Sequence, residues 1–172
     1  EGTTIHMANS SVIRYCQLFD PIKGCNYFAN RGTSGIDGST STALGYAHLD
    51  EQLNVLITGD VSFLYDSNAL RLRALAPNLK IILINNQGGG IFRIIEGAKS
   101  SQQLEQYFEA QHSSDGKLAA HAGWSYKVSS SVDSIEETLQ EFFDSTAVNF
   151  IEFKTEPIQS PQTLKDFFTF VR

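Results

Sequence analysis

Blocks of mostly apolar residues recur along the chain and predict the strands of a buried sheet. The two clearest lie at 54–58 and 80–84, and the second contains the run Ile81-Ile82-Leu83-Ile84. Continuous runs of aliphatic and β-branched residues are typical of parallel strands that are covered on both faces. Segments in which polar residues interrupt the apolar ones predict four further strands, at 3–8, 26–29, 124–128 and 149–153.

Helical spacing of apolar residues fills the intervals between these strands. Ser10 or Ser11 can cap a first helix. Further helices are expected at 39–48, at 66–76 where Pro77 closes the segment, and at 102–111. The helix at 39–48 is rich in small residues, so it can pack closely against the sheet.

The last two helices are the most clearly marked. Ser134 and Glu137 have the spacing of a capping box, and an apolar stripe follows, formed by Ile135, Leu139, Phe142 and Phe143. Ser160-Pro161 starts the other helix, whose stripe is Leu164, Phe167, Phe168 and Val171. Regular alternation of strands and helices predicts an α/β fold, a three-layer α/β/α sandwich around a mostly parallel sheet.

Length and charge narrow the function classes. A chain of 172 residues with 41% hydrophobic and 19% charged residues predicts a single globular domain over 1–172. Its net charge of −6 and its scattered basic residues argue against nucleic acid as a partner. An acidic domain that binds an anionic ligand needs backbone N–H groups, local arginines or a metal ion.

The cysteines and the chain start bear on location. Cys16 and Cys25 are too few for a disulfide framework or a zinc site, so we expect a reducing, cytoplasmic environment. The longest aliphatic run is far too short to span a bilayer. Because the chain opens at Glu1 directly into a predicted strand, it is expected to be part of a longer multidomain protein.

Two strand ends carry the candidate chemistry. Thr58-Gly59-Asp60 follows one buried strand and Asn85-Asn86-Gln87-Gly88 follows the next, so neighbouring strands would bring these groups to one sheet edge. A carboxylate with amide and main-chain oxygens suits Mg²⁺ that is also bound by ligand phosphates, and the helix after Asp60 adds N–H groups. Taken singly, each motif is also typical of an ordinary turn or glycine-rich loop.

The spacing of these two motifs resembles that of thiamine diphosphate enzymes. In that fingerprint Gly-Asp-Gly precedes Asn-Asn by an interval like the 24 residues found here, although Val61 replaces the third glycine. The resemblance implies that Asp60, the Asn86 side chain and the Gly88 carbonyl bind Mg²⁺ or Mn²⁺. It also implies that these metal ligands, with Gly59, Val61 and Ser62, hold the cofactor's diphosphate.

Longer strings resemble one branch of these enzymes, the MenD synthases of menaquinone biosynthesis. They lie at 9–14, 30–38, 59–70 and 85–92, all in the first half of the chain. Members of that family decarboxylate 2-oxoglutarate and add the resulting four-carbon carbanion equivalent, that of succinyl semialdehyde, to isochorismate. The resemblance therefore implies a transferase that takes two polyanionic substrates, for which guanidinium groups are suitable partners.

The same resemblance assigns residues to the substrates and the cofactor. Substrate-facing polar groups would be Ser10, Arg14 and Arg31, and the pocket wall would be Ile91, Phe92 and Ile95. Ile36 would lie beneath the cofactor, where the Ser34 carbonyl and the Ile36 N–H contact the pyrimidine ring. The alternative interpretation is structural: Ser10 caps a helix, the arginines are solvated and the isoleucines belong to the core.

The catalytic glutamate of the family has no counterpart here. It belongs to a pyrimidine-binding domain that precedes this region and usually acts across a homodimer or tetramer. None of Glu51, Glu96, Glu105 or Glu109 matches its motif. We therefore expect no certain catalytic residue in this chain and no turnover by the chain alone.

Other functions stay open at this point. Another thiamine diphosphate enzyme, such as a 2-oxoacid decarboxylase or an acetohydroxyacid synthase, is the nearest alternative, and a non-catalytic binding module is the second. A nicotinamide dehydrogenase is disfavoured because Gly-x-Gly-x-x-Gly is absent after the first strand. A Ser-His-Asp hydrolase lacks Gly-x-Ser-x-Gly, and its candidate histidines fit no constellation: His6, His48, His112 and His121.

Overall fold

The computed structural model describes residues 2–95, 97–109 and 116–171, and these contain one six-stranded sheet. Its strands are β1 (Thr4–Met7), β2 (Asn26–Phe28), β3 (Asn54–Gly59), β4 (Leu79–Asn85), β5 (Tyr126–Ser129) and β6 (Phe150–Lys154). They lie in the order β2-β1-β3-β4-β6-β5, and every neighbouring pair is parallel. The predicted parallel sheet is confirmed.

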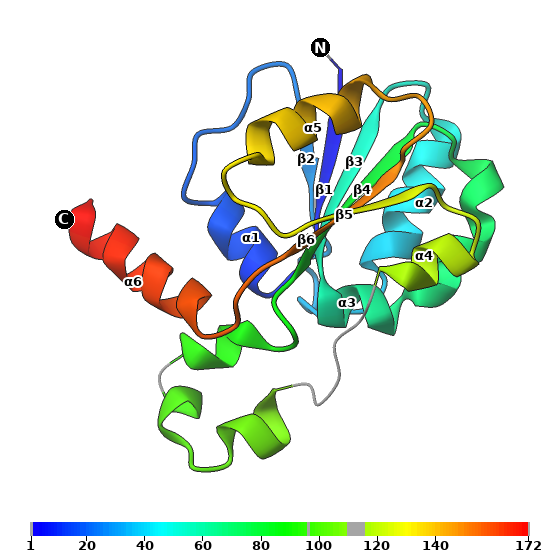
Figure 1. Ribbon diagram of the computed structural model, residues 1–172. Helices are drawn as coiled ribbons and strands as arrows, with labels where there is room; N and C mark the ends of the chain where they lie inside the picture. The colour runs from blue at the N-terminus through cyan, green and yellow to red at the C-terminus, as the bar shows by residue number, and fades with distance from the viewer. Residues whose placement is uncertain (1, 96, 110–115, 172) are drawn as a thin grey trace.

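Helices cover both faces of this sheet (Figure 1). They are α1 (Ser11–Cys16), α2 (Ser39–Leu49), α3 (Asp60–Tyr65), α4 (Lys117–His121), α5 (Ile135–Asp144) and α6 (Gln159–Phe170). In Figure 1, α2 and α4 lie on one side of the strands, α1 and α5 lie on the other, and α6 extends away from the sheet. This arrangement is the predicted three-layer sandwich.

Two hydrophobic clusters follow from the alternation of side chains along β3 and β4. Leu56, Ile81 and Leu83 pack into the larger cluster with α2, α3 and α4. Val55 and Ile82 point to the opposite face, where they pack with α5. Because side chains alternate across a strand, each central strand contributes to both layers of the core.

The strand order creates a topological switch point between β1 and β3. β2 lies on the outer side of β1, whereas the following strand β3 lies on its inner side. Successive crossovers therefore leave in opposite directions, and the loops after β1 and β3 diverge to leave a crevice. Ligands of open parallel sheets bind at the carboxyl ends of strands at such a point. The loops after β1, β3 and β4 are thus the first place to look for a site.

The helix expected at 66–76 is wrong in its start and its type. Helix α3 begins directly at Asp60, and a 3-10 segment with a kink at Leu72 spans Ser67–Leu75. The cause lies in Asp66, whose carboxylate accepts hydrogen bonds from the Ser41 backbone N–H (2.7 Å) and hydroxyl (3.0 Å). Asp66 therefore caps α2 and is turned away from a helix of its own.

Two expected caps are also wrong. The Ser134 backbone has a turn conformation (φ −110°, ψ 16°), and its side chain makes no capping hydrogen bond. A capping side chain needs an extended backbone at that position, so the predicted box with Glu137 does not form. Ser10 precedes α1 with φ 73° and likewise makes no side-chain cap.

The helix expected at 102–111 is shorter than predicted. The structure has a π-helical turn at Leu104–Phe108, and residues 110 and 111 lie outside the described range. Glu109 leaves the helical path because Arg93 binds its carboxylate through Nε (2.5 Å) and Nη2 (2.8 Å). A bidentate ion pair of this kind fixes the backbone on both sides of it.

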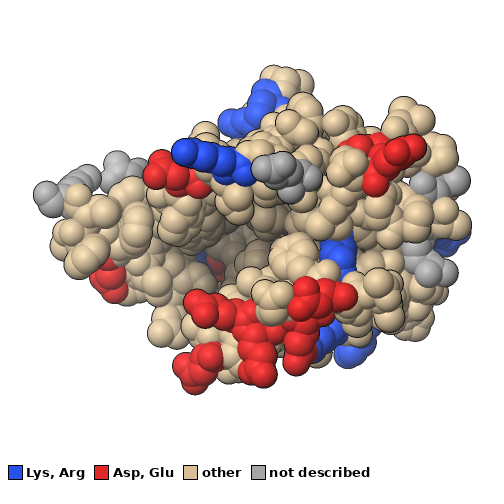
Figure 2. All heavy atoms as spheres, turned by 90° about the horizontal axis from the view of Figure 1, so that it is seen from above, with Lys and Arg blue, Asp and Glu red and all other residues tan. Residues whose placement is uncertain are grey.

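Two further features concern the helices and the distribution of surface charge. Among the described residues no helix is long and apolar enough to cross a membrane. Figure 2 shows acidic side chains gathered along one border of the face seen from above, whereas Lys and Arg side chains are scattered. A basic stripe that could follow a nucleic-acid backbone is therefore not seen on this face.

Candidate functional site

Asp60 lies at the carboxyl end of β3, directly beside the end of β4. The register pairs Gly59 with Ile84, so Asp60 and Asn85 occupy equivalent positions just beyond it. Asp60 is 3% exposed; its Oδ1 accepts a 2.9 Å hydrogen bond from the Val61 N–H. Its Oδ2 is buried and accepts no hydrogen bond from the described part of the chain. An orphaned buried carboxylate oxygen is costly unless a ligand or ion binds it.

Burial raises the pKa of Asp60 above its usual range. The backbone N–H groups of Val61, Gly88 and Gln87 partly offset this effect, because they favour the charged carboxylate. These N–H groups come from both strand ends. The convergence of the two motifs, predicted from their places in the sequence, is therefore confirmed.

The loop after β4 has an unusual backbone. Gln87, Gly88 and Gly89 all have positive φ angles, of 63°, 100° and 69°. A Cβ atom on Gly90 would come within 2.4 Å of the Asn86 Nδ2 atom, so the half-buried Asn86 side chain lies against this glycine. Asn85, by contrast, is 3% exposed and points into the protein. Asn86 is thus the asparagine of this pair that stays partly exposed at the strand end.

This donor set fits a hard divalent cation. Within the described residues no group of three or more His, Cys, Asp or Glu side chains could hold a metal ion. A cation at Asp60 would therefore need amide and main-chain oxygens, which Asn86 and Gly88 carry in the adjacent loop. The orphaned Oδ2 of Asp60 is the group that such an ion would satisfy.

Asn9, which follows β1, organises the loop after β2. It is 2% exposed, and its Nδ2 donates to the carbonyl oxygens of Asn30 (2.8 Å) and Gly35 (2.6 Å). Its Oδ1 accepts a 2.7 Å hydrogen bond from Arg31 Nη1. One buried amide therefore fixes both the glycine-rich loop and the guanidinium group of Arg31.

The predicted cofactor loop is attached to α3 as well. The Ser62 hydroxyl donates a 2.5 Å hydrogen bond to the Ile36 carbonyl oxygen, and the Ser62 side chain is buried. Ile36 is half-buried, whereas Ser34 is exposed with φ 58°. The loop that carries both residues therefore approaches the Asp60 end of β3.

Backbone strain gathers at this edge. In the described chain the non-glycine residues with positive φ are Ser10, Ser34 and Gln87, which follow β1, β2 and β4 respectively. Such conformations cost free energy and persist where surrounding structure imposes them, often at ligand sites. The distribution supports a site at the carboxyl ends of these strands.

The predicted substrate residues lie on these same loops. Arg31 is bound to Asn9, the neighbour of Ser10, and the exposed Arg14 follows Ser10 by one helical turn in α1. The predicted wall lies in and after the 3-10 segment Gly90–Arg93, where Ile91 is buried, Phe92 is half-buried and Ile95 is 39% exposed. Both groups therefore lie on segments that follow the carboxyl ends of β1, β2 and β4.

Three residues with structural roles here were not anticipated. Asn9, Arg93 and Glu152 all make buried or bidentate polar contacts that order the loops. Glu152 had a visible signal, because it is a lone carboxylate inside the apolar strand 150–153. Asn9 lies in the string at 9–14 that resembles the family, but its contacts, like those of Arg93, had no local signal, since their partners lie more than ten residues away in the sequence.

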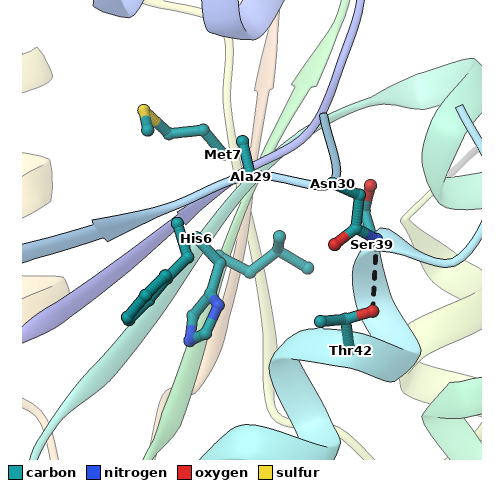
Figure 3. A pocket seen from close by; sticks show the side chains of 8 residues that line it. His6, Met7, Ala29, Asn30, Ser39 and Thr42 are labelled. Carbon is teal, nitrogen blue, oxygen red and sulfur yellow. Dashed lines mark hydrogen bonds between the residues drawn. The ribbon is translucent and has the colours of Figure 1, made fainter. Parts of the chain in front are cut away.

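A small pocket lies beside this edge, between β1, β2 and α2 (Figure 3). Asn30 donates a 3.1 Å hydrogen bond to the Thr42 hydroxyl across it, and His6 and Met7 line it from β1. Its volume of about 20 Å³ is enough for one water molecule and far too small for a cofactor. We therefore place no ligand there.

Comparison with known proteins decides the family. Residues 10–153 match the model of the thiamine pyrophosphate enzyme, C-terminal TPP binding domain. This chain belongs to that family. Thiamine pyrophosphate is thiamine diphosphate, so membership implies the cofactor that the Gly-Asp and Asn-Asn motifs predicted. The dehydrogenase and hydrolase alternatives are set aside by this membership.

Two relatives of this thiamine diphosphate-binding domain carry the same name, 2-succinyl-5-enolpyruvyl-6-hydroxy-3-cyclohexene-1-carboxylate synthase. The protein from Christiangramia forsetii is 40% identical over 174 residues, which cover 100% of this chain and 30% of that protein. The one from Flavobacterium johnsoniae is 44% identical over 170 residues, 98% of this chain and 31% of the relative. The chain therefore spans about a third of the length of these relatives.

Proposed function

We propose that this domain is the diphosphate-binding part of a synthase of menaquinone biosynthesis. The whole enzyme would decarboxylate 2-oxoglutarate and transfer the remaining four-carbon unit to isochorismate. Support comes from the shared name of relatives 40% and 44% identical over nearly all of this chain. The observation that carries the proposal is the buried, orphaned Oδ2 of Asp60 at the switch point.

Asp60, the Asn86 side chain and the Gly88 carbonyl would hold Mg²⁺ or Mn²⁺ at the cofactor's diphosphate. Gly59, Val61 and Ser62 would contact the cofactor through their backbone, because the Ser62 hydroxyl already binds Ile36. Ile36 and the Ser34 carbonyl would contact the cofactor's rings. When bound, thiamine diphosphate supplies the electron sink for decarboxylation and carbon–carbon bond formation.

Arg31, Arg14 and Ser10 would bind substrate carboxylates. The guanidinium of Arg31 is already oriented by Asn9 through a 2.7 Å hydrogen bond, so little side-chain entropy is lost when it binds an anion. Ile91, Phe92 and Ile95 would form the apolar wall that excludes water from the reacting carbon atoms. The chain's own residues thus bind and orient the substrates.

The remaining machinery is expected elsewhere in a longer polypeptide. The family's activating glutamate would come from an amino-terminal, pyrimidine-binding domain, across the interface of a homodimer or tetramer. We expect this chain alone to bind thiamine diphosphate weakly and to turn over no substrate. This expectation agrees with its covering 30% and 31% of the relatives' lengths.

The test is a kinetic comparison of Arg31→Ala with the unmodified full-length enzyme. Loss of a charge-assisted, oriented contact should lower kcat/KM for one or both substrates by about 10- to 100-fold. Arg31→Lys should recover little, because it keeps the charge and loses the planar donor pair. Arg71→Ala, at an exposed arginine of the segment Ser67–Leu75, is the matched control. Unchanged values for both substrates in Arg31→Ala would remove Arg31 from the pocket.

A further inference from the structure

A fully buried carboxylate, Glu152, lies on β6 directly behind the loop that carries Asn86. Its side chain is 0% exposed and sits among apolar neighbours on the strand. Oε1 accepts a 2.6 Å hydrogen bond from Asn85 Nδ2. Oε2 accepts hydrogen bonds from the Gly116 N–H (3.2 Å) and from the Tyr126 hydroxyl. Every group named here as facing the carboxylate is therefore a donor.

The Asn85 amide has a single orientation, because an acceptor faces it on one side and a donor on the other. Its Nδ2 faces Glu152, and its Oδ1 accepts a 3.0 Å hydrogen bond from the Gln87 N–H. A backbone N–H can only donate and a carboxylate accepts, so a flipped amide would face donor with donor and acceptor with acceptor. Asn85 cannot satisfy both neighbours in any other way.

The Gln87 backbone is where this orientation matters. Gln87 has φ 63°, a strained conformation for a residue with a side chain, and it begins the run of positive φ angles through Gly89. The hydrogen bond from its N–H to Asn85 Oδ1 closes the turn around Asn86. The same turn presents the backbone of Gln87 and Gly88 to the Asp60 carboxylate.

We propose that Glu152 is a positioning residue for the cofactor site. It sets the direction of the Asn85 amide, which holds Asn86 and Gly88 in place opposite Asp60. Glu152 makes no contact with the ligand itself. The proposal rests on the proposed thiamine diphosphate site, and it adds to that site a residue two steps behind the ligands.

The role of Glu152 is tested in the full-length protein by exchanging the donor and the acceptor between the side chains of Asn85 and Glu152. Glu152→Gln brings an amide donor into a place that needs an acceptor on both sides. Asn85→Asp puts two carboxylates at the 2.6 Å contact. In the double variant the amide nitrogen introduced at position 152 faces the new carboxylate at position 85. The other oxygen of that carboxylate still accepts from Gln87, so the pattern of donors and acceptors is restored.

The readout is the dissociation constant of thiamine diphosphate at fixed Mg²⁺, measured by calorimetry below each variant's melting temperature. Each single substitution should weaken binding by about 10- to 100-fold, the usual effect of losing an outer-shell partner. The double variant should regain most of that loss. Hydrogen exchange at the Gln87 amide should rise in the single variants and fall again in the double variant.

Tyr126→Phe is the control for a purely structural role. It removes a donor to Oε2 and leaves the Asn85 contact intact, so it should lower the melting temperature without changing the dissociation constant. Glu152→Gln that is folded and binds thiamine diphosphate like the wild type overturns the proposal. So does a double variant whose melting temperature recovers while its binding does not. Absence of Mg²⁺-dependent binding in the wild type would instead overturn the proposed function.

Discussion

The Ser62 hydroxyl donates a 2.5 Å hydrogen bond to the carbonyl oxygen of Ile36, and this contact joins the loop after β2 to the helix after β3. Ser62 belongs to α3, which begins at Asp60. The residue proposed to lie beneath the cofactor's rings is thereby attached to the element that holds its diphosphate. The two ends of one ligand would be positioned by a single buried contact.

Removing this contact should weaken cofactor binding more than stability. Ser62→Ala leaves the Ile36 carbonyl oxygen to water, because the loop is half-exposed, and should cost about 1 kcal/mol of unfolding free energy. The loop would then sample other positions, and thiamine diphosphate affinity should fall several-fold. Urea unfolding and calorimetry check the two effects. Ser131→Ala, at an exposed serine outside the site, should change neither; equal binding by both variants would contradict the role of Ser62.

Asn9 should tolerate no exchange of its amide for a carboxylate. Asn9→Asp keeps the shape and the acceptor for Arg31, but turns two donated hydrogen bonds into contacts between a carboxylate and the carbonyls of Asn30 and Gly35. A buried acceptor facing two acceptors should cost about 2 to 4 kcal/mol of unfolding free energy. Thermal unfolding measures this loss. Wild-type stability in Asn9→Asp would show that Asn9 does not organise the loop.

In the absence of metal, the ionised side chain of Asp60 should lower the free energy of unfolding at neutral pH. Its pKa is raised by burial, so below its ordinary pKa both folded and unfolded states are protonated and there is no penalty. As the pH rises, the unfolded state loses the proton first, and stability falls until the folded pKa is passed. Asp60→Asn should therefore be more stable than the wild type at pH 7 in EDTA, by about 1 to 3 kcal/mol.

The advantage of Asp60→Asn over the wild type in free energy of unfolding should shrink as the pH is lowered through the raised pKa of Asp60. The same variant should lose Mg²⁺-dependent binding of thiamine diphosphate, since an amide replaces the one carboxylate of the site. Chemical unfolding over a pH series, with calorimetry on the same samples, gives both quantities. A variant that is less stable at neutral pH, or that keeps metal-dependent binding, would be at odds with this assignment.

His6 should change the pH dependence of the unfolding free energy in the direction opposite to Asp60. Burial lowers its pKa, while the hydrogen bond from Nε2 to Asn54 (2.8 Å) and the nearby Asp50 carboxylate oppose this. As the pH falls through histidine's ordinary pKa, the unfolded state takes up the proton first. The contribution of His6 to the free energy of unfolding is therefore fully present above that pKa and is lost as the pH falls below it. Unfolding free energies at about pH 7.5 and about pH 5.5 should differ less in His6→Gln, which keeps the hydrogen bond. An identical pH dependence would show that His6 is not the group responsible.

Local patterns were sufficient for the sheet. The strands 54–58 and 80–84 have continuous aliphatic centres at 55–57 and 81–84, and that pattern has few outcomes other than a sheet covered on both faces. The adjacency of β3 and β4 was predictable for the same reason, and it brings Asp60 to the loop after Asn85. Helix ends were predicted less well, because Asp66 and Glu109 bind partners far away in the sequence.

The site was predictable only in part. Residues at strand ends, such as Asp60 and Asn86, could be found because parallel strands place their carboxyl ends together. The residues behind them could not be assigned a role in this way. The function of Glu152 depends on the orientation of the Asn85 amide, which the Glu152 carboxylate and the Gln87 N–H set from two sides. A sequence does not display such contacts before the chain is folded.

The most direct test is a calorimetric titration of thiamine diphosphate into the protein, first with Mg²⁺ and then with EDTA, beside Asp60→Ala. We expect binding that requires the metal and is abolished by the substitution, since Asp60 supplies the carboxylate of the site. The full-length protein should bind more tightly than the chain of 172 residues. Equal binding in EDTA, or unchanged binding by Asp60→Ala, would contradict this expectation.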